Sequence, residues 1–464
     1  MTSYHWATLS SVPWYHMNRF VTEINSLIKL AAPVSLAQLC LVGMTATDVL
    51  FAGQAGTTDL AGMNLGANTW SLIIYFFMGV GFATQPLVAK HYGARDEAGI
   101  KHQIHQSMWM CFALGIIATL VVWVSAWAIQ FIRFDPDLLS IAQQYLMAIS
   151  LCAIPITMIP ALRGALEGMS LTREVFLVNF GAFLLNIPMD YVLVNGLYGL
   201  PKLGGVGCAW STVGLMWLVF LASSVVVSQH HKLRDKKLLK NFERPNIPTI
   251  VRTLKMGVPM GASLLIELSM FAGAGMMIAM FGVIQAGAHA VAITVASMSF
   301  MLYMGIGQGV TIRASQFLGA GRADDAWYSV RAGTIFNLMV AIAICIAFVL
   351  FTEPLIRLFS DDPDVIQLAI VLLYFGAAFQ VADSLQIAAI CGLRAYHDTQ
   401  SPPKYQFISF SLVGLPLGVG TAFYGWWPGL EGAKGMWFAM VVSLSLVGLL
   451  LLWRLATRVR DTAV

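Results

Sequence analysis

Long runs of apolar residues, separated by short polar or glycine- and proline-marked segments, follow one another along almost the whole chain. A helix needs roughly 20 mostly apolar residues to cross a bilayer. Twelve runs reach that length, at about 27–51, 63–88, 104–131, 138–162, 172–196, 205–229, 252–281, 288–312, 329–352, 364–392, 404–425 and 435–456. The pattern therefore predicts an all-α integral membrane protein with twelve transmembrane helices.

Short motifs recur in the two halves of the chain at an offset of 226 residues. Residues 29–33 (KLAAP) match residues 255–259 (KMGVP), and residues 78–81 (MGVG) match residues 304–307 (MGIG). Six predicted helices, an even number, separate the copies, so both copies have the same orientation in the membrane. The sequence therefore predicts two parallel six-helix repeats around a central cleft, an arrangement that suits alternating access.

Positive charge is concentrated on one side of the predicted membrane. If the N-terminus is inside, only four of the 27 lysine and arginine residues lie outside, namely Arg133, Lys202, Arg357 and Lys434. The positive-inside rule then places both termini in the cytoplasm. The polar residues 230–249 are predicted to form a basic cytoplasmic linker between an N-terminal lobe (1–229) and a C-terminal lobe (250–464). This linker would also attract anionic lipid, and a regulatory docking site is the alternative interpretation.

Composition supports a membrane protein and excludes several other classes. Hydrophobic residues make up 58% of the chain and charged residues 11%, with a mean hydropathy of +0.74, whereas soluble domains carry about 25% charged residues. The net charge of +4 is too small to indicate nucleic acid as a partner. The six cysteines lie in apolar runs without a CxxC pair, so we expect packing residues and no redox or zinc site.

Four acidic residues lie well inside the predicted helices: Asp48, Asp190, Glu267 and Asp383. A charge within the bilayer costs at least about 2.5–3.5 kcal/mol, so each of them indicates a functional site. Counting helical rise from the nearest basic residues places Asp48 and Asp190 at one depth, and Glu267 and Asp383 at another. Asn186 lies one turn from Asp190 on the same helix face. Such clusters of oxygen atoms suit Na⁺ or a proton.

Motifs of enzymes are absent from the sequence. It contains no HExxH, no GxxxxGK[ST] and no GxSxG, so we expect neither an enzyme nor a cofactor. Without a phosphate-binding loop, a stored ion gradient is the expected source of energy. The acids do not follow the repeat, because Glu267 aligns with Leu41 and Asp48 with Ala274.

Motifs along essentially the whole chain resemble the multidrug and toxic compound extrusion (MATE) family, most closely its bacterial NorM-like branch. They are Pro33, residues 47–53 (TDVLFAG), 185–190 (LNIPMD) and 203–208 (LGGVGC), Pro259 with Glu267, and residues 383–386 (DSLQ) and 392–398 (GLRAYHD). The resemblance implies an antiporter that exports organic cations and drugs in exchange for Na⁺ or H⁺.

The resemblance also implies roles for individual residues in the N-terminal lobe. Asp48, Asn186 and Asp190 correspond to the family's coupling-ion site, with the hydroxyl of Thr212 close by. Na⁺ at these acids is the implied metal. Pro33 corresponds to the proline at which the family's first helix bends, and Pro259 occupies the equivalent place in the other lobe.

In the C-terminal lobe, the resemblance implies that Glu267 and Asp383 bind the coupling ion and the substrate. NorM-like relatives often have a tyrosine one turn before the aspartate, where this chain has Phe379. The lost hydroxyl removes an oxygen ligand, so a proton is favoured over Na⁺ at this site.

Two alternatives to drug export stay open. The first is a flippase for lipids or lipid-linked sugars, a function found in the same superfamily, although such substrates are usually anionic and the predicted interior is acidic. The second is a membrane channel or receptor, which the parallel repeat and the unpaired acids disfavour. The expected location is the bacterial inner membrane, with surrounding lipid as the partner and a monomer as the expected state.

Overall fold

The computed structural model describes residues 12–131, 135–199 and 201–463, and its regular structure is helical throughout. The N-terminal lobe consists of α1 (Val12–Ala55), α2 (Thr57–Gly81), α3 (Thr84–Gly93), α4 (Glu97–Ala128), α5 (Pro136–Ile149), α6 (Ala153–Gly168), α7 (Thr172–Asn195) and α8 (Gly205–Gln229). The C-terminal lobe consists of α9 (Ile247–Ala279), α10 (Val283–Gly319), α11 (Ala323–Leu350), α12 (Thr352–Arg357), α13 (Pro363–Ala395), α14 (Ser401–Gln406), α15 (Leu415–Ala422) and α16 (Ala433–Ala463).

Twelve helical segments in the described part of the chain are long and apolar enough to cross a membrane, which confirms the predicted number. Four spans are composite. Thr57–Gly93 contains α2 and α3, Glu97–Phe131 extends α4 by a short 3₁₀ turn, and Pro136–Gly168 contains α5 and α6. The span Ser401–Ala422 joins α14 to α15 through a π-helical segment, Phe407–Gly414. Most spans are longer than predicted because polar residues continue the helices beyond the apolar runs.

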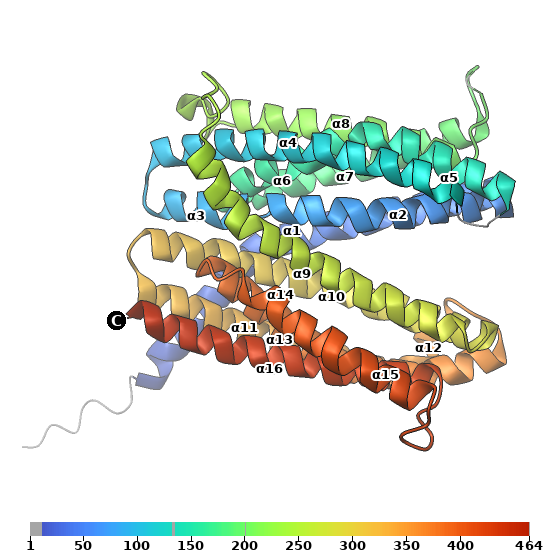
Figure 1. Cartoon of the computed structure of the whole chain (residues 1–464). Coiled ribbons are helices and arrows are strands. Elements are labelled where there is room, and N and C mark those ends of the chain that lie inside the picture. Colours follow the sequence, from blue (N-terminus) through green and yellow to red (C-terminus); the bar gives the residue numbers. More distant parts are fainter. Residues whose placement is uncertain (1–11, 132–134, 200, 464) are drawn as a thin grey trace, which may run out of the picture.

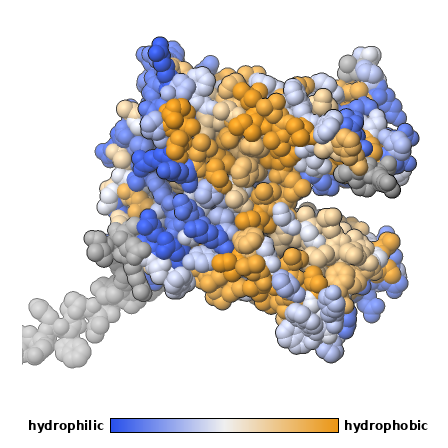
Figure 2. Space-filling view, viewed as in Figure 1, coloured by the Kyte–Doolittle hydropathy of each residue, from blue (hydrophilic) through white to orange (hydrophobic). Residues whose placement is uncertain are grey.

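The two lobes touch at one end of the molecule and separate at the other. Figure 1 shows α2–α8 above α10–α16, with α1 and α9 crossing between the two layers and the loops after α3 and α10 one above the other on the left. We call this side, which carries Gly93 and Gly319, the closed end. Figure 2 shows a deep hollow between the lobes at the opposite side, which we call the open end. The predicted central cleft is therefore accessible from one side.

Glycines allow the close contact between the lobes, and they occupy equivalent positions in the two repeats. A Cβ on Gly93 would overlap the carbonyl oxygen of Gln316, and a Cβ on Gly319 would overlap that of Lys90, the residue equivalent to Gln316. Farther into the membrane, a Cβ on Gly79 would lie 2.6 Å from Cα of Gly261. The repeated glycines are thus required for backbone-to-backbone packing between the lobes.

The first helix of each lobe begins against the other lobe. At the start of α1, Glu23 accepts a hydrogen bond of 2.7 Å from Nη2 of Arg313 in α10, and α1 then crosses to pack along α7. At the start of α9, Thr253 accepts a hydrogen bond of 3.1 Å from Gln103 in α4. Pro33 lies inside α1 and Pro259 inside α9, so each crossing helix has a position that lacks one backbone hydrogen bond.

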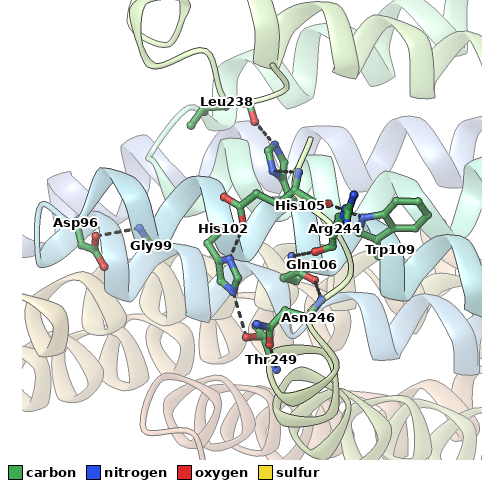
Figure 3. A network of polar contacts seen from close by, with 11 residues as sticks. Asp96, Gly99, His102, His105, Gln106, Trp109, Leu238, Arg244, Asn246 and Thr249 are labelled. Atoms are coloured by element: carbon green, nitrogen blue, oxygen red, sulfur yellow. Dashed lines mark hydrogen bonds and ion pairs between the residues drawn. The ribbon is translucent and has the colours of Figure 1, made fainter. Parts of the chain in front are cut away.

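The linker between the lobes is folded onto α4 (Figure 3). His102 contacts Oε2 of Glu243 at 2.5 Å, and His105 contacts the carbonyl oxygen of Leu238 at 2.6 Å. Trp109 donates a hydrogen bond of 2.9 Å to the carbonyl oxygen of Glu243, and Leu233 and Leu238 are buried. These contacts fix the linker to the N-terminal lobe up to the start of α9.

Valine at Gly261 is expected to weaken the contact at the closed end. Gly273 in the same helix has no neighbour within 4 Å of its potential Cβ, so Gly273→Val is a matched control with the same change in helix propensity. Overpacking costs about 1–3 kcal/mol. We expect spin labels at the exposed positions Arg95 and Ala323 to report longer distances in Gly261→Val and unchanged distances in Gly273→Val. Equal distributions in the two variants would contradict the assigned packing.

Candidate functional site

Asp48, Asn186 and Asp190 meet inside the N-terminal lobe. Gly43 allows α1 to approach α7, because a Cβ there would lie only 2.7 Å from the ring of Phe183. Little more than one turn farther along α1, Asp48 accepts a hydrogen bond of 3.1 Å from the amide nitrogen of Asn186. Asp190 follows Asn186 by one turn and is fully buried. The structure thus brings together Asp48 and Asp190, which the sequence placed at one depth, and Asn186, which it placed on the same helix face as Asp190.

Helix α8 completes this cluster with a thiol and a hydroxyl. The Cys208 thiol donates a hydrogen bond of 3.4 Å to the carbonyl oxygen of Asp48. One potential ligand atom each from Asp48, Asp190 and Cys208 lie within 4.8 Å of one another. The hydroxyl beside Asp190 is that of Ser211, which is fully buried, whereas the predicted Thr212 follows it and is half-buried. We call Asp48, Asn186, Asp190, Cys208 and Ser211 the N-lobe cluster.

Glu267 of α9 lies in a second cluster, inside the C-terminal lobe. Its two carboxylate oxygens accept hydrogen bonds from the amide groups of Gln386, at 3.2 Å, and Gln406, at 3.3 Å. Ser263 donates a hydrogen bond of 2.5 Å to the amide oxygen of Gln406. Gln406 directly precedes the π-helical segment, and such segments are frequent at functional sites. Two amides, from α13 and α14, therefore hold Glu267 in place.

Asp383 lies one turn before Gln386 in α13 and is 2% exposed. Its Oδ1 atom and the hydroxyl of Tyr303 are both buried without a hydrogen-bond partner in the described part of the chain. Phe379 packs against Phe271 and Trp437, with ring centroids 5.9 and 6.3 Å away. Phe379 is therefore part of an apolar wall. Tyr303 of α10 lies near enough to Asp383 to interact with its charge, and we call Glu267, Asp383, Gln386, Gln406 and Tyr303 the C-lobe cluster.

A polar network fills the contact between the lobes on the closed side of both clusters. Arg163 pairs with Glu167 at 2.5 Å and donates a hydrogen bond of 3.0 Å to Gln38. Gln85 donates hydrogen bonds to Glu167 and, across the lobes, to Gln308 at 3.1 Å. The cavity at this network has a volume of about 30 Å³, which is enough for a water molecule and far too small for an organic cation.

His397 lies outside the spans, between α13 and α14 at the closed end. The pKa of this imidazole is lowered to about 4. Burial is the main cause, and the nearby cations Lys90 and Arg252 contribute to the same shift. His397 is therefore neutral at physiological pH and adds no positive charge to the closed end.

The sequence alone predicts no functional role for several polar residues of these sites. Glu167 is a further buried carboxylate, 2% exposed, and its only sequence signal is Arg163 four residues earlier within an apolar run. Gln386 and Gln406 carry no charge, so a search for buried charges does not select them. Cys208 was expected to be a packing residue, but the structure places its thiol beside two carboxylates. The remaining cysteines, like Cys208, form no disulfide in the described part of the chain.

Sequence comparisons agree with the motifs. The family model MatE matches residues 33–192 and 259–419, one segment in each repeat. Multidrug resistance protein NorM of Aliivibrio fischeri is 32% identical over 439 residues, which cover 95% of this chain and 95% of that protein. Multidrug resistance protein PmpM of Pseudomonas aeruginosa is 31% identical over 95% of this chain and 93% of its own length. The resemblance found in the motifs is thereby confirmed.

Solved structures share the fold at much lower sequence identity. The eukaryotic MATE transporter AtDTX14 superposes with a TM-score of 0.85 at 15% identity and covers 95% of this chain and 98% of its own. A MOP superfamily transporter from Pyrococcus furiosus superposes with a TM-score of 0.83 at 16% identity, over 94% of this chain and 95% of its own. On the matched segments and the full-length similarity, this chain belongs to the MATE (MatE) family.

Proposed function

We propose that this protein is an antiporter of the bacterial inner membrane that exports small organic cations and drugs in exchange for an inwardly moving cation. The observation that carries the proposal is a pair of buried acidic clusters, one in each lobe, in a molecule that is closed on one side of these clusters and open on the other. The names of the related multidrug resistance proteins support export of drugs.

Orientation follows from the distribution of positive charge. Arg163, Arg313 and Arg394 lie in the half of the molecule that contains the closed end, and the basic linker lies there as well. The positive-inside rule assigns this end to the cytoplasm. The described conformation then faces outward, and a substrate could leave from the cleft but could not enter it from the cytoplasm.

Competition for the acids couples the two movements. A deprotonated carboxylate attracts a cationic substrate from the cytoplasm, and a cation that arrives from outside neutralises the carboxylate and releases the substrate. Release of this cation to the cytoplasm then restores the charge. Either ligand, the coupling cation or the cationic substrate, compensates the buried negative charge. The protein can therefore change conformation with either of them bound, but not with the carboxylate charged and empty.

We favour the proton as the coupling ion. Na⁺ prefers several oxygen ligands, and Phe379, which packs against Phe271 and Trp437, offers none beside Asp383. Oxygen atoms of Asp48 and Asp190 lie within 4.8 Å of each other, so the two negative charges repel and a proton on either carboxylate relieves the repulsion. Among the described residues, no ion pair joins a basic side chain to a carboxylate of either cluster; Arg394 acts on Glu267 only from a distance, and Glu267 is satisfied by two amides.

Coupling can be tested in proteoliposomes with a cationic dye and separately imposed gradients. We expect a pH gradient to drive dye export in Na⁺-free buffer. We also expect Asp383→Asn to reduce export to background, because the asparagine amide cannot bind and release a proton as the carboxylate does. Asp364→Asn, which alters an exposed acid of the same helix, is the matched control. Export that requires a Na⁺ gradient would reverse the choice of ion, and unchanged export by Asp383→Asn at normal expression would exclude a coupling role for this residue.

Pro33→Ala is expected to slow the change of conformation and to leave dye binding intact. Proline is about 3 kcal/mol less favourable than alanine inside a helix, so alanine stabilises the straight form of α1. Pro136→Ala is a suitable control, because Pro136 lies at the first turn of α5 where proline breaks no bond. The measurements are equilibrium dye binding and the rate of export. Wild-type export by Pro33→Ala would show that Pro33 is no hinge.

A further inference from the structure

A thiol is the unusual member of the N-lobe cluster. Carboxylates and an amide are sufficient to bind a proton or Na⁺, because each of these two ions binds to oxygen atoms. Cys208 nevertheless presents its sulfur within 4.8 Å of ligand oxygens from Asp48 and Asp190. Sulfur beside carboxylates is a donor set that selects zinc-like cations over alkali cations.

Buried oxygen atoms without partners surround this sulfur. Asp190 is 0% exposed, and neither of its carboxylate oxygens has a hydrogen-bond partner in the described part of the chain. The amide oxygen of Asn186 and the hydroxyl of Ser211 are buried and unpartnered in the same way. These atoms lie close to one another. Since a buried polar atom without a partner is costly, a bound proton or a metal cation between them would relieve that cost, independently of the thiol.

The spacing fits a tetrahedral ion after small side-chain movements. Zn–O bonds of about 2.1 Å and a Zn–S bond of about 2.3 Å place neighbouring ligand atoms about 3.4–3.6 Å apart. The ligand atoms of Asp48, Asp190 and Cys208 lie within 4.8 Å of one another. Rotation of these side chains by a small amount would bring the atoms to the distances that a bound ion requires. Asp48, Asp190 and Cys208 provide three ligands, and the amide oxygen of Asn186 is available as the fourth.

We propose that the N-lobe cluster is also a binding site for a thiophilic divalent cation of the Zn²⁺ and Cd²⁺ class, which blocks the exchange by occupying the acids. Binding displaces the proton of the Cys208 thiol and any proton on the carboxylates to solvent, and leaves a thiolate bound to the metal. The inhibitory part rests on the proposed coupling role of these acids, but metal binding itself does not.

The site is specific to one lobe. In the described part of the chain, Asp48, Asp190 and Cys208 form the only group of three such residues with this spacing. In the C-lobe cluster, Glu267 is bonded to Gln386 and Gln406 and not to a cysteine. A thiophilic cation should therefore distinguish the two lobes, whereas a proton can bind to both.

Co²⁺ is a suitable probe for the purified full-length protein, because a cobalt–thiolate bond gives a charge-transfer band in the near ultraviolet. We expect this band at one equivalent of Co²⁺ in the wild type, its loss when Zn²⁺ is added, and its absence in Cys208→Ser. The matched control is Cys152→Ser, which alters a fully buried cysteine of the same lobe outside the cluster and should keep the band. Removal of a direct ligand should weaken Zn²⁺ binding by more than about 100-fold.

Two results would overturn the metal site: no charge-transfer band in the wild type, or a band that persists in Cys208→Ser. Asp190→Asn, which keeps the thiol, should also weaken Zn²⁺ binding, so the conclusion does not depend on the folding of one variant. Added Zn²⁺ should inhibit dye export by Cys152→Ser and should inhibit Cys208→Ser much less. A Co²⁺ band without inhibition would overturn the blocking role alone, and a missing band with intact proton-driven export would refute the metal site while the antiport proposal stands.

Discussion

The cost of an uncompensated charge inside the membrane determines where the functional residues of this protein lie. A carboxylate cannot face lipid, so Asp190, Glu267 and Asp383, deep in the spans, are buried within a lobe, and Asp48 is half-buried beside Asn186. Amides satisfy Glu267, Arg163 satisfies Glu167, and Asp190 has no hydrogen-bond partner among the described residues. The buried acids thus differ in how their charge is compensated: by amides at Glu267, and by an ion pair at Glu167.

The fold could be predicted well from the sequence because lipid imposes a strong pattern. Apolar runs of sufficient length gave the number of helices, and the repeated motifs gave two parallel lobes. Helical rise also placed Asp48 with Asp190 and Glu267 with Asp383, since depth along a straight helix follows directly from residue number. The helix ends were less predictable, because polar residues such as those at the start of α1 continue a helix outside the membrane.

Contacts between distant segments were beyond the reach of the sequence. Neither Tyr303 nor Gln406 differs in its local pattern from an ordinary packing residue, and each acquires its role from a helix that is far away along the chain. The linker illustrates the same limit. Its charges suggested a solvated segment, but buried Leu233 and Leu238 and the contacts of His102 and His105 attach it to α4. Tertiary packing decided each of these cases.

The contact between Gly79 and Gly261 lies nearer the closed end of the spans than the open end, so a small rotation of one lobe about this contact moves the open end farther than the closed end. From Gly79, beside Gly261, to the start of α2 at Thr57 the helix extends about 33 Å. A rotation of one degree about the glycine contact therefore displaces the far end of α2 by about 0.6 Å. A tilt of about ten degrees would therefore move the far end of α2 by about 6 Å, roughly the width of an aromatic ring. The backbones at the glycine contact itself would move by much less than the width of a methyl group.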